Sequence, residues 1–138
     1  MVELGVRAII RNSTGILLVK SVRGLKQGTW SLHGGKVNFK ERPEDAIKRE
    51  IKEELSLEFD PVFVTYKEDL DLSPSQDYLT LFFAGKVIGE VRYKPDEIKE
   101  YKYFPPYEIR SSSLEISLGH KDILLAQIEG NLDKSSTG

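Results

Sequence analysis

The chain has 138 residues, of which 39% are hydrophobic and 30% are charged, and its formal net charge is −2. This length suits one compact domain, and the composition is that of an ordinary globular protein rather than a disordered or fibrous chain. A near-neutral charge argues against general nucleic-acid binding, which needs a concentrated basic surface. The absence of cysteine excludes a disulfide framework and a thiolate nucleophile.

Location and domain extent follow from simple patterns. Residues 1–7 lack the basic start and apolar stretch of a signal peptide, and the chain contains no run of about 18 apolar residues that could span a membrane. We therefore expect a cytoplasmic protein without membrane contact. One domain is expected over residues 1–130, followed by a polar, disordered tail over residues 131–138.

Strand signals dominate the N-terminal part. Residues 2–11 and 15–20 are rich in Val, Ile and Leu, and turn-forming residues separate them, which predicts a β-hairpin. A polar loop is expected over residues 21–29, followed by a short strand over residues 30–32. Gly34 and Gly35 are expected to break the strand pattern.

The clearest helix is predicted over residues 43–55. Proline suits its first turn, and acidic residues there complement the helix dipole. Ile47, Ile51 and Leu55 are spaced by four and should face the core. Further strands are predicted over residues 62–66, 78–87 and 99–104, and a C-terminal helix over residues 121–128. The layout is a mixed sheet flanked by about two helices.

One face of the helix over residues 43–55 is acidic. Glu50, Glu53 and Glu54 fall within an arc of about 100° on a helical wheel. Because like charges at these spacings repel, the arrangement favours a bound cation, and carboxylate oxygens suit Mg²⁺ or Mn²⁺. Taken alone, the same pattern also fits an ordinary solvated glutamate face.

The residues before this acidic face favour the metal site over a solvated glutamate face. The spacing of seven residues resembles the signature of the Nudix hydrolases: Gly35, Glu41, Arg49, Glu50, Glu53, Glu54 and Leu57. Two positions depart from that signature: Ser56 stands where the pattern has glycine at a left-handed helix exit, and His33 stands where many relatives have proline. The resemblance implies a fold of the α/β (α+β) class. It is expected to be an α/β/α sandwich with a mixed central β-sheet.

The resemblance also implies roles for individual residues. Glu50, Glu53, Glu54 and the carbonyl of Gly34 would hold Mg²⁺, or Mn²⁺ in its place. Glu50 or Glu53 is the nearest candidate for the base that activates water. Arg49 is expected to pair with Glu41 or with a carboxylate of the helix, and so to fix the loop against the helix. Later acids serve as the base or as an extra metal ligand in some relatives, and Glu97 and Glu100 are the candidates here, although both also fit plain surface acids.

Substrate contacts carry weaker signals. Arg7, Arg23 and Lys26 are candidates for phosphate contact, and Trp30, Tyr78 or Phe82 for stacking on a base, with core packing as the competing interpretation for the aromatic residues. His33 is either a substrate contact or a histidine that satisfies local hydrogen bonds.

The implied activity is hydrolysis of the diphosphate linkage in a nucleoside diphosphate joined to another moiety: a nucleoside triphosphate, a nucleotide sugar or a dinucleotide. The partner is then a small nucleotide. The alternative is a non-catalytic nucleotide sensor on the same fold, but this chain retains every acid of the signature. A prenyl diphosphate isomerase would need a cysteine, and an RNA-decapping enzyme would need more basic surface. Dimers are common in the family, and nothing in the sequence identifies an interface for a homodimer.

Overall fold

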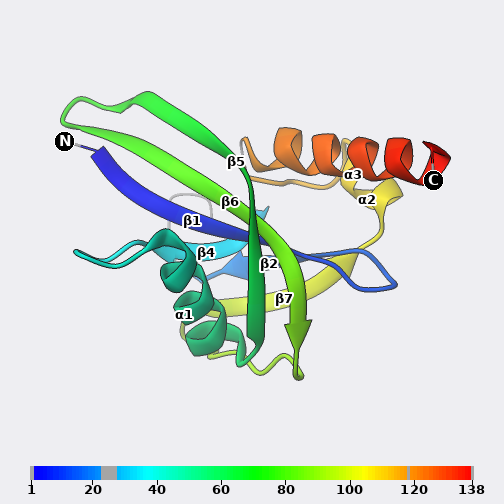
Figure 1. Cartoon of the computed structure of the whole chain (residues 1–138), viewed down its shortest axis with the longest axis horizontal. Helices are drawn as coiled ribbons and strands as arrows, with labels where there is room; N and C mark the ends of the chain where they lie inside the picture. Colours follow the sequence, from blue (N-terminus) through cyan, green and yellow to red (C-terminus); the bar gives the residue numbers. More distant parts are fainter. Residues whose placement is uncertain (1, 23–27, 118, 138) are drawn as a thin grey trace.

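The structure is a computed structural model that describes residues 2–22, 28–117 and 119–137 (Figure 1). Its elements, in chain order, are β1 (Val2–Ile10), β2 (Ile16–Ser21), β3 (Trp30–Ser31), β4 (His33–Lys36), α1 (Pro43–Leu55), β5 (Glu58–Ser73), β6 (Gln76–Ile88), β7 (Ile98–Phe104), α2 (Pro106–Arg110) and α3 (His120–Thr137).

The strands form two sheets. A four-stranded sheet has the order β4-β1-β6-β5, and a three-stranded sheet has the order β3-β2-β7. In the first sheet, β1 runs parallel to β6 and antiparallel to β4, which makes this sheet mixed. In the second sheet, β2 pairs antiparallel with both of its neighbours.

Helices cover the strands on both sides (Figure 1). Ile47 and Ile51 of α1 pack in one core cluster with Ile10 of β1, whereas Leu124 of α3 packs in a second cluster with Ile9 of β1. Neighbouring residues of one strand thus belong to different clusters, because both faces of that strand are buried. This arrangement confirms the predicted fold class, a mixed sheet between helices.

The predicted hairpin at the N-terminus is wrong beyond its turn. The Asn12 amide donates to the Gly15 carbonyl at 2.9 Å, and Arg11 and Ile16 form a single bridge. β1 and β2 then join different sheets, and β2 pairs with β3 and β7 instead. Residues 16–19 are buried, so β2 is covered on both faces and does not fold back on β1.

Helix α1 begins and ends where the sequence predicts. Its exit residue Ser56 adopts a left-handed conformation, with φ of 62° and ψ of 29°. The Ser56 amide donates to the Lys52 carbonyl at 3.1 Å, and its hydroxyl donates to the Arg92 carbonyl at 3.0 Å. The turn expected for glycine is therefore made by serine and anchored to the loop before β7.

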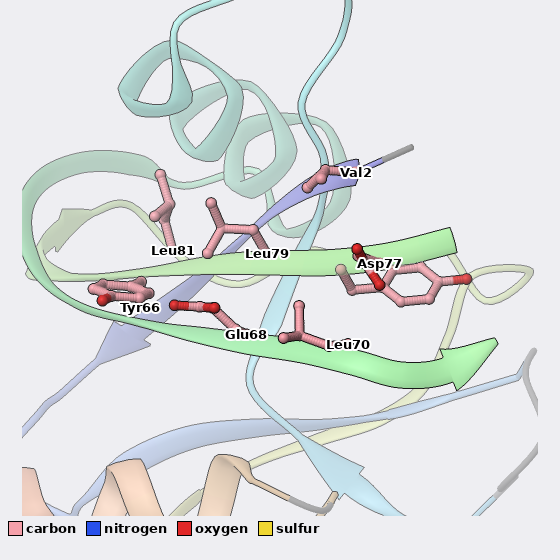
Figure 2. A pocket seen from close by; sticks show the side chains of 8 residues that line it. Val2, Tyr66, Glu68, Leu70, Asp77, Leu79 and Leu81 are labelled. Atoms are coloured by element: carbon pink, nitrogen blue, oxygen red, sulfur yellow. The ribbon is translucent and has the colours of Figure 1, made fainter. Parts of the chain in front are cut away.

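The remaining elements extend beyond their predictions. β5 and β6 form one long hairpin that continues through residues 67–77, between the two strands predicted over residues 62–66 and 78–87. Their distal part, with Val2, lines an apolar cavity of about 330 Å³ (Figure 2). α2 was not predicted, and α3 begins at His120 and continues past residue 128 into the expected tail. Among the described residues, no helix is both long and apolar enough to cross a membrane.

Candidate active site

Strand β4 brings two glycines against the neighbouring elements. Gly34 pairs with Arg7 of β1, and a Cβ at Gly34 would lie 1.8 Å from the Val6 carbonyl oxygen. A Cβ at Gly35 would lie 2.4 Å from the Glu50 carboxyl carbon. The strand predicted over residues 30–32 does end before these glycines, at Ser31, but Gly34 and Gly35 do not break the strand pattern: they lie in a separate strand, β4, of the other sheet. Only glycine allows β1 on one side and the Glu50 carboxylate on the other to approach this closely.

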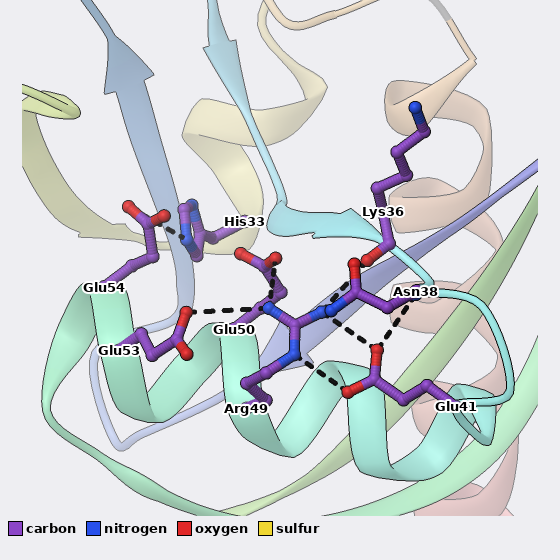
Figure 3. A network of polar contacts seen from close by, with 8 residues as sticks. All are labelled: His33, Lys36, Asn38, Glu41, Arg49, Glu50, Glu53 and Glu54. Carbon is purple, nitrogen blue, oxygen red and sulfur yellow. Dashed lines mark hydrogen bonds and ion pairs between the residues drawn. The ribbon is translucent and has the colours of Figure 1, made fainter.

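Arg49 links the loop before α1 to the helix (Figure 3). Its guanidinium donates to both carboxylate oxygens of Glu41, at 2.8 and 3.0 Å. It also donates to Glu50 at 2.9 Å and to the Lys36 carbonyl at 3.0 Å. The fork geometry of arginine allows these bonds to form together. This network confirms the expected pairing of Arg49 with Glu41.

The charges in this network stabilise one another. Hydrogen bonds from Arg49, then from the Asn38 amide, lower the pKa of Glu41 to about 2. The carboxylates, Glu41 first, raise the pKa of Arg49. Glu41 and Arg49 therefore remain charged over the whole physiological range and hold the residue 36–41 loop on the helix.

Beside this network lies a cluster of three side chains that could hold a metal ion. One ligand atom from each of His33, Glu50 and Glu54 lies within 4.8 Å of the other two (Figure 3). All three side chains are largely buried, with exposed fractions of 11%, 14% and 20%. Crowding two carboxylates in a partly dehydrated site is unfavourable without a counter-charge.

The pKa values of these three groups reflect first their burial and then the charges around them. Burial raises the pKa of Glu50, although Arg49 opposes the effect. Burial, followed by the charges of Glu97 and Glu50, raises the pKa of Glu54. Burial, followed by the charge of Arg7, lowers the pKa of His33 to about 4, so its imidazole is neutral at pH 7.

Two partly buried side chains hold the backbone before His33. Arg7 donates to the Leu32 carbonyl at 3.0 Å, and the Leu32 amide donates to Nδ1 of His120 at 3.3 Å. Burial lowers the pKa of Arg7, and the charge of Glu50 opposes this shift. Sequence reasoning missed His120, since a histidine at the start of a distant helix gives no local signal.

The other predicted site residues lie in varied places. Glu53 is 55% exposed and approaches Arg49 at 3.5 Å. Glu97 acts on Glu54 through its charge, whereas Glu100 lies 3.9 Å from Lys20. Trp30 packs edge-to-face on Phe104 in the second core cluster, which also buries Phe82, and Tyr78 lines the distal cavity of Figure 2. Arg23 and Lys26 fall outside the described residues.

The residues present fit a divalent cation. The cluster combines two crowded carboxylates with a buried imidazole nitrogen, His33 Nε2, that has no hydrogen-bond partner among the described residues. A cation at this position would relieve both features. A site that could hold a divalent cation suits metal-assisted hydrolysis, the class of reaction that the resemblance to the Nudix signature implies.

Comparisons with known proteins agree with this class. The family model of the NUDIX domain matches residues 1–126, and the chain belongs to this family. It is 30% identical to the nucleoside triphosphatase NudI of Salmonella heidelberg, over 81% of this chain and 88% of the relative. The NudI of Salmonella typhimurium is 29% identical over the same shares.

Solved structures share the fold. A MutT NUDIX hydrolase from Burkholderia pseudomallei superposes with a TM-score of 0.79 at 25% identity, over 90% of this chain and 96% of that one. A MutT protein from Methanosarcina mazei gives a TM-score of 0.77 at 23% identity, over 94% and 95% of the two chains. The protein is therefore a Nudix hydrolase.

Proposed function

We propose that the protein hydrolyses a diphosphate linkage of nucleoside triphosphates with the help of Mg²⁺ or Mn²⁺. The observation that carries the proposal is the crowding of Glu50 and Glu54 beside the Arg49 network, at the place where β4 passes the helix. The similarity to NudI, a nucleoside triphosphatase, favours triphosphates over nucleotide sugars and dinucleotides.

Each residue of the site has a distinct task in this proposal. Glu50, Glu53, Glu54 and the Gly34 carbonyl hold the cation, which supplies positive charge to the diphosphate oxygens. Arg49 keeps Glu50 and Glu53 in place, through contacts of 2.9 and 3.5 Å. Gly35 leaves the space that the Glu50 carboxylate occupies.

Among the later acids, we propose Glu97 rather than Glu100 as the second candidate base. Glu97 immediately precedes β7, and its charge raises the pKa of Glu54, so the two carboxylates lie near each other. Glu100 lies on β7 beside Lys20. A base must be able to reach the water that attacks phosphorus, and Glu97 is the better placed of the two.

The experiment is a substrate panel with two paired double variants. Nucleoside triphosphates, nucleotide sugars and dinucleotides are incubated with Mg²⁺ or Mn²⁺ in H₂¹⁸O, and mass spectrometry identifies which product carries the label. We expect turnover of nucleoside triphosphates, reduced at least about 100-fold in the variant that combines Glu53→Gln and Glu54→Gln. The control variant combines Glu44→Gln and Glu129→Gln, two exposed acids on α1 and α3, and should retain full activity.

The outcomes separate the alternatives. Undiminished turnover by the Glu53 and Glu54 variant would refute the assigned site. Binding of nucleotides by the parent protein without release of any product would refute catalysis and support a nucleotide sensor.

A further inference from the structure

His33 has a polar atom that the rest of the described chain leaves without a partner. Its Nε2 is fully buried and makes no hydrogen bond to the described residues, and its side chain is 11% exposed. The nearest opposite charge is a Glu54 oxygen at 4.0 Å, which is too long for a hydrogen bond. Burying a hydrogen-bonding nitrogen without a partner destabilises a fold, so such an atom calls for a ligand.

The nitrogen points at the carboxylates of α1. Figure 3 shows the imidazole beside Glu54, with Glu50 on its other side. Ligand atoms of these three residues lie within 4.8 Å of one another. Around an octahedral ion with bonds of about 2.0–2.1 Å, neighbouring ligands stand about 2.9 Å apart and opposite ligands about 4.1 Å apart. Shifts of about 1 Å by each side chain would therefore close the set.

The backbone holds this imidazole in place. His33 pairs with Ala8 in the β1–β4 ladder. The preceding residue, Leu32, is fixed at both its carbonyl, by Arg7, and its amide, by His120. A side chain on a strand anchored on both sides has few alternative positions, which is the condition for a preorganised ligand.

We propose that His33 Nε2 is a direct ligand of the divalent cation held by Glu50 and Glu54, so that this site has a mixed nitrogen and oxygen ligand set. The inference rests on the proposed function for the presence of the cation and adds a ligand from outside the helix. The same atom also explains why a histidine is accommodated before the paired glycines, where its nitrogen would otherwise be stranded.

A nitrogen ligand changes which metal the site prefers. Mg²⁺ prefers oxygen ligands, whereas imidazole is a good ligand for later first-row metals, whose affinity rises from Mn²⁺ towards Ni²⁺. The site should therefore discriminate in favour of Mn²⁺ and Co²⁺ over Mg²⁺ more strongly than an all-oxygen site. Loss of the imidazole should remove that advantage and leave the weaker Mg²⁺ binding nearly unchanged.

The test uses Mn²⁺ alone as the probe of the intact protein. Electron spin-echo envelope modulation of bound Mn²⁺ detects a coordinated imidazole nitrogen. Labelling with ¹⁵N-histidine shifts this signal and so identifies histidine as its source without any amino-acid substitution. The chain has only two histidines. We expect the nitrogen signal in the parent protein and in the His120→Gln variant, and its loss in His33→Gln. Mn²⁺ affinity should fall about tenfold or more in His33→Gln, with Mg²⁺ affinity changed less than about threefold.

The outcomes distinguish this inference from the proposed function. One outcome would overturn the ligand role of His33 and leave the hydrolase proposal intact. In it, Mn²⁺ binds the parent protein without an imidazole nitrogen signal, and Glu54→Gln abolishes the binding. A nitrogen signal that survives His33→Gln would also overturn it. Failure of the parent to bind Mn²⁺ or Mg²⁺ would overturn both, whereas nitrogen coupling without nucleotide turnover would uphold the ligand and refute the function.

Discussion

Substituting either of the paired glycines by alanine should separate catalysis from folding. At Gly35, the added Cβ would meet the Glu50 carboxyl carbon at 2.4 Å and its oxygens at 2.5 and 2.7 Å. Ordinary contacts are 3.4 Å or longer, so the carboxylate must move by about 1 Å. A displacement of that size in a catalytic group costs about 100-fold in rate. We therefore expect kcat of Gly35→Ala to fall about 100-fold, together with a weaker affinity for Mn²⁺.

The stability of Gly35→Ala should change little. The obstructing atoms are the end of a flexible side chain, and alanine reduces the freedom of the unfolded chain, so the free energy of unfolding should stay within about 1 kcal/mol of the parent value. At Gly34 the added Cβ would instead meet the Val6 carbonyl oxygen at 1.8 Å, which belongs to the backbone of β1. There the strands must separate, and a loss of about 3 kcal/mol is expected, or about 10 °C in Tm.

Steady-state kinetics, calorimetric titration with Mn²⁺ and thermal unfolding followed by circular dichroism measure the two variants side by side. Full activity in Gly35→Ala would refute the view that this glycine makes room for Glu50. A loss of stability in Gly35→Ala as large as that in Gly34→Ala would equally refute it, because the clash would then be a backbone effect.

Three further substitutions test other contacts. Arg49→Lys keeps the charge but cannot bridge Glu41, Glu50 and a carbonyl at once, so kcat should fall at least about tenfold; unchanged kcat would show that charge alone suffices. Burial lowers the pKa of His120 to about 3 in the folded protein, below its value of about 6.5 in the unfolded chain. The neutral histidine therefore contributes its full stability above pH 6.5, and this contribution is lost as the pH falls towards 3. Urea unfolding at pH 7 and pH 5 should show less acid destabilisation in His120→Gln than in the parent. Ser56→Gly should be about 1 kcal/mol more stable than Ser56→Ala, since both lose the hydroxyl and only alanine strains at a φ of 62°; equal urea midpoints would contradict this.

Local signals explain what the sequence predicts well. The limits of α1 depend on a proline at its start, apolar residues spaced by four and a left-handed exit, all of which lie within the helix or next to it. The pairing of Arg49 with Glu41 spans eight residues and also belongs to this local signature. Such features are encoded by neighbours in the chain, so the spacing of residue types reveals them.

Features that depend on contacts between residues far apart in the sequence were not predicted. Residues 2–11 and 15–20 have the composition of a hairpin, but burial on both faces sends β1 and β2 into different sheets. The five residues of α2 are too few to show helical periodicity. The approach of Glu97 to Glu54 depends on how the loop before β7 returns to α1, and the two acids are 43 residues apart. No local pattern distinguishes Glu97 from Glu100.

The position before the paired glycines shows how the two kinds of information combine. The sequence alone marks His33 only as a departure, with a local hydrogen bond or a substrate contact as its interpretations. The structure leaves Nε2 without a partner among the described residues and places it 4.0 Å from Glu54, so this nitrogen does not make the local hydrogen bond of the first interpretation. Because β1 and His120 fix the strand on which it stands, the imidazole belongs to the same constellation as the helix acids. A departure from a family pattern at a site is thus best interpreted through the atom that it leaves unsatisfied, and here that atom lies where the proposed cation would bind.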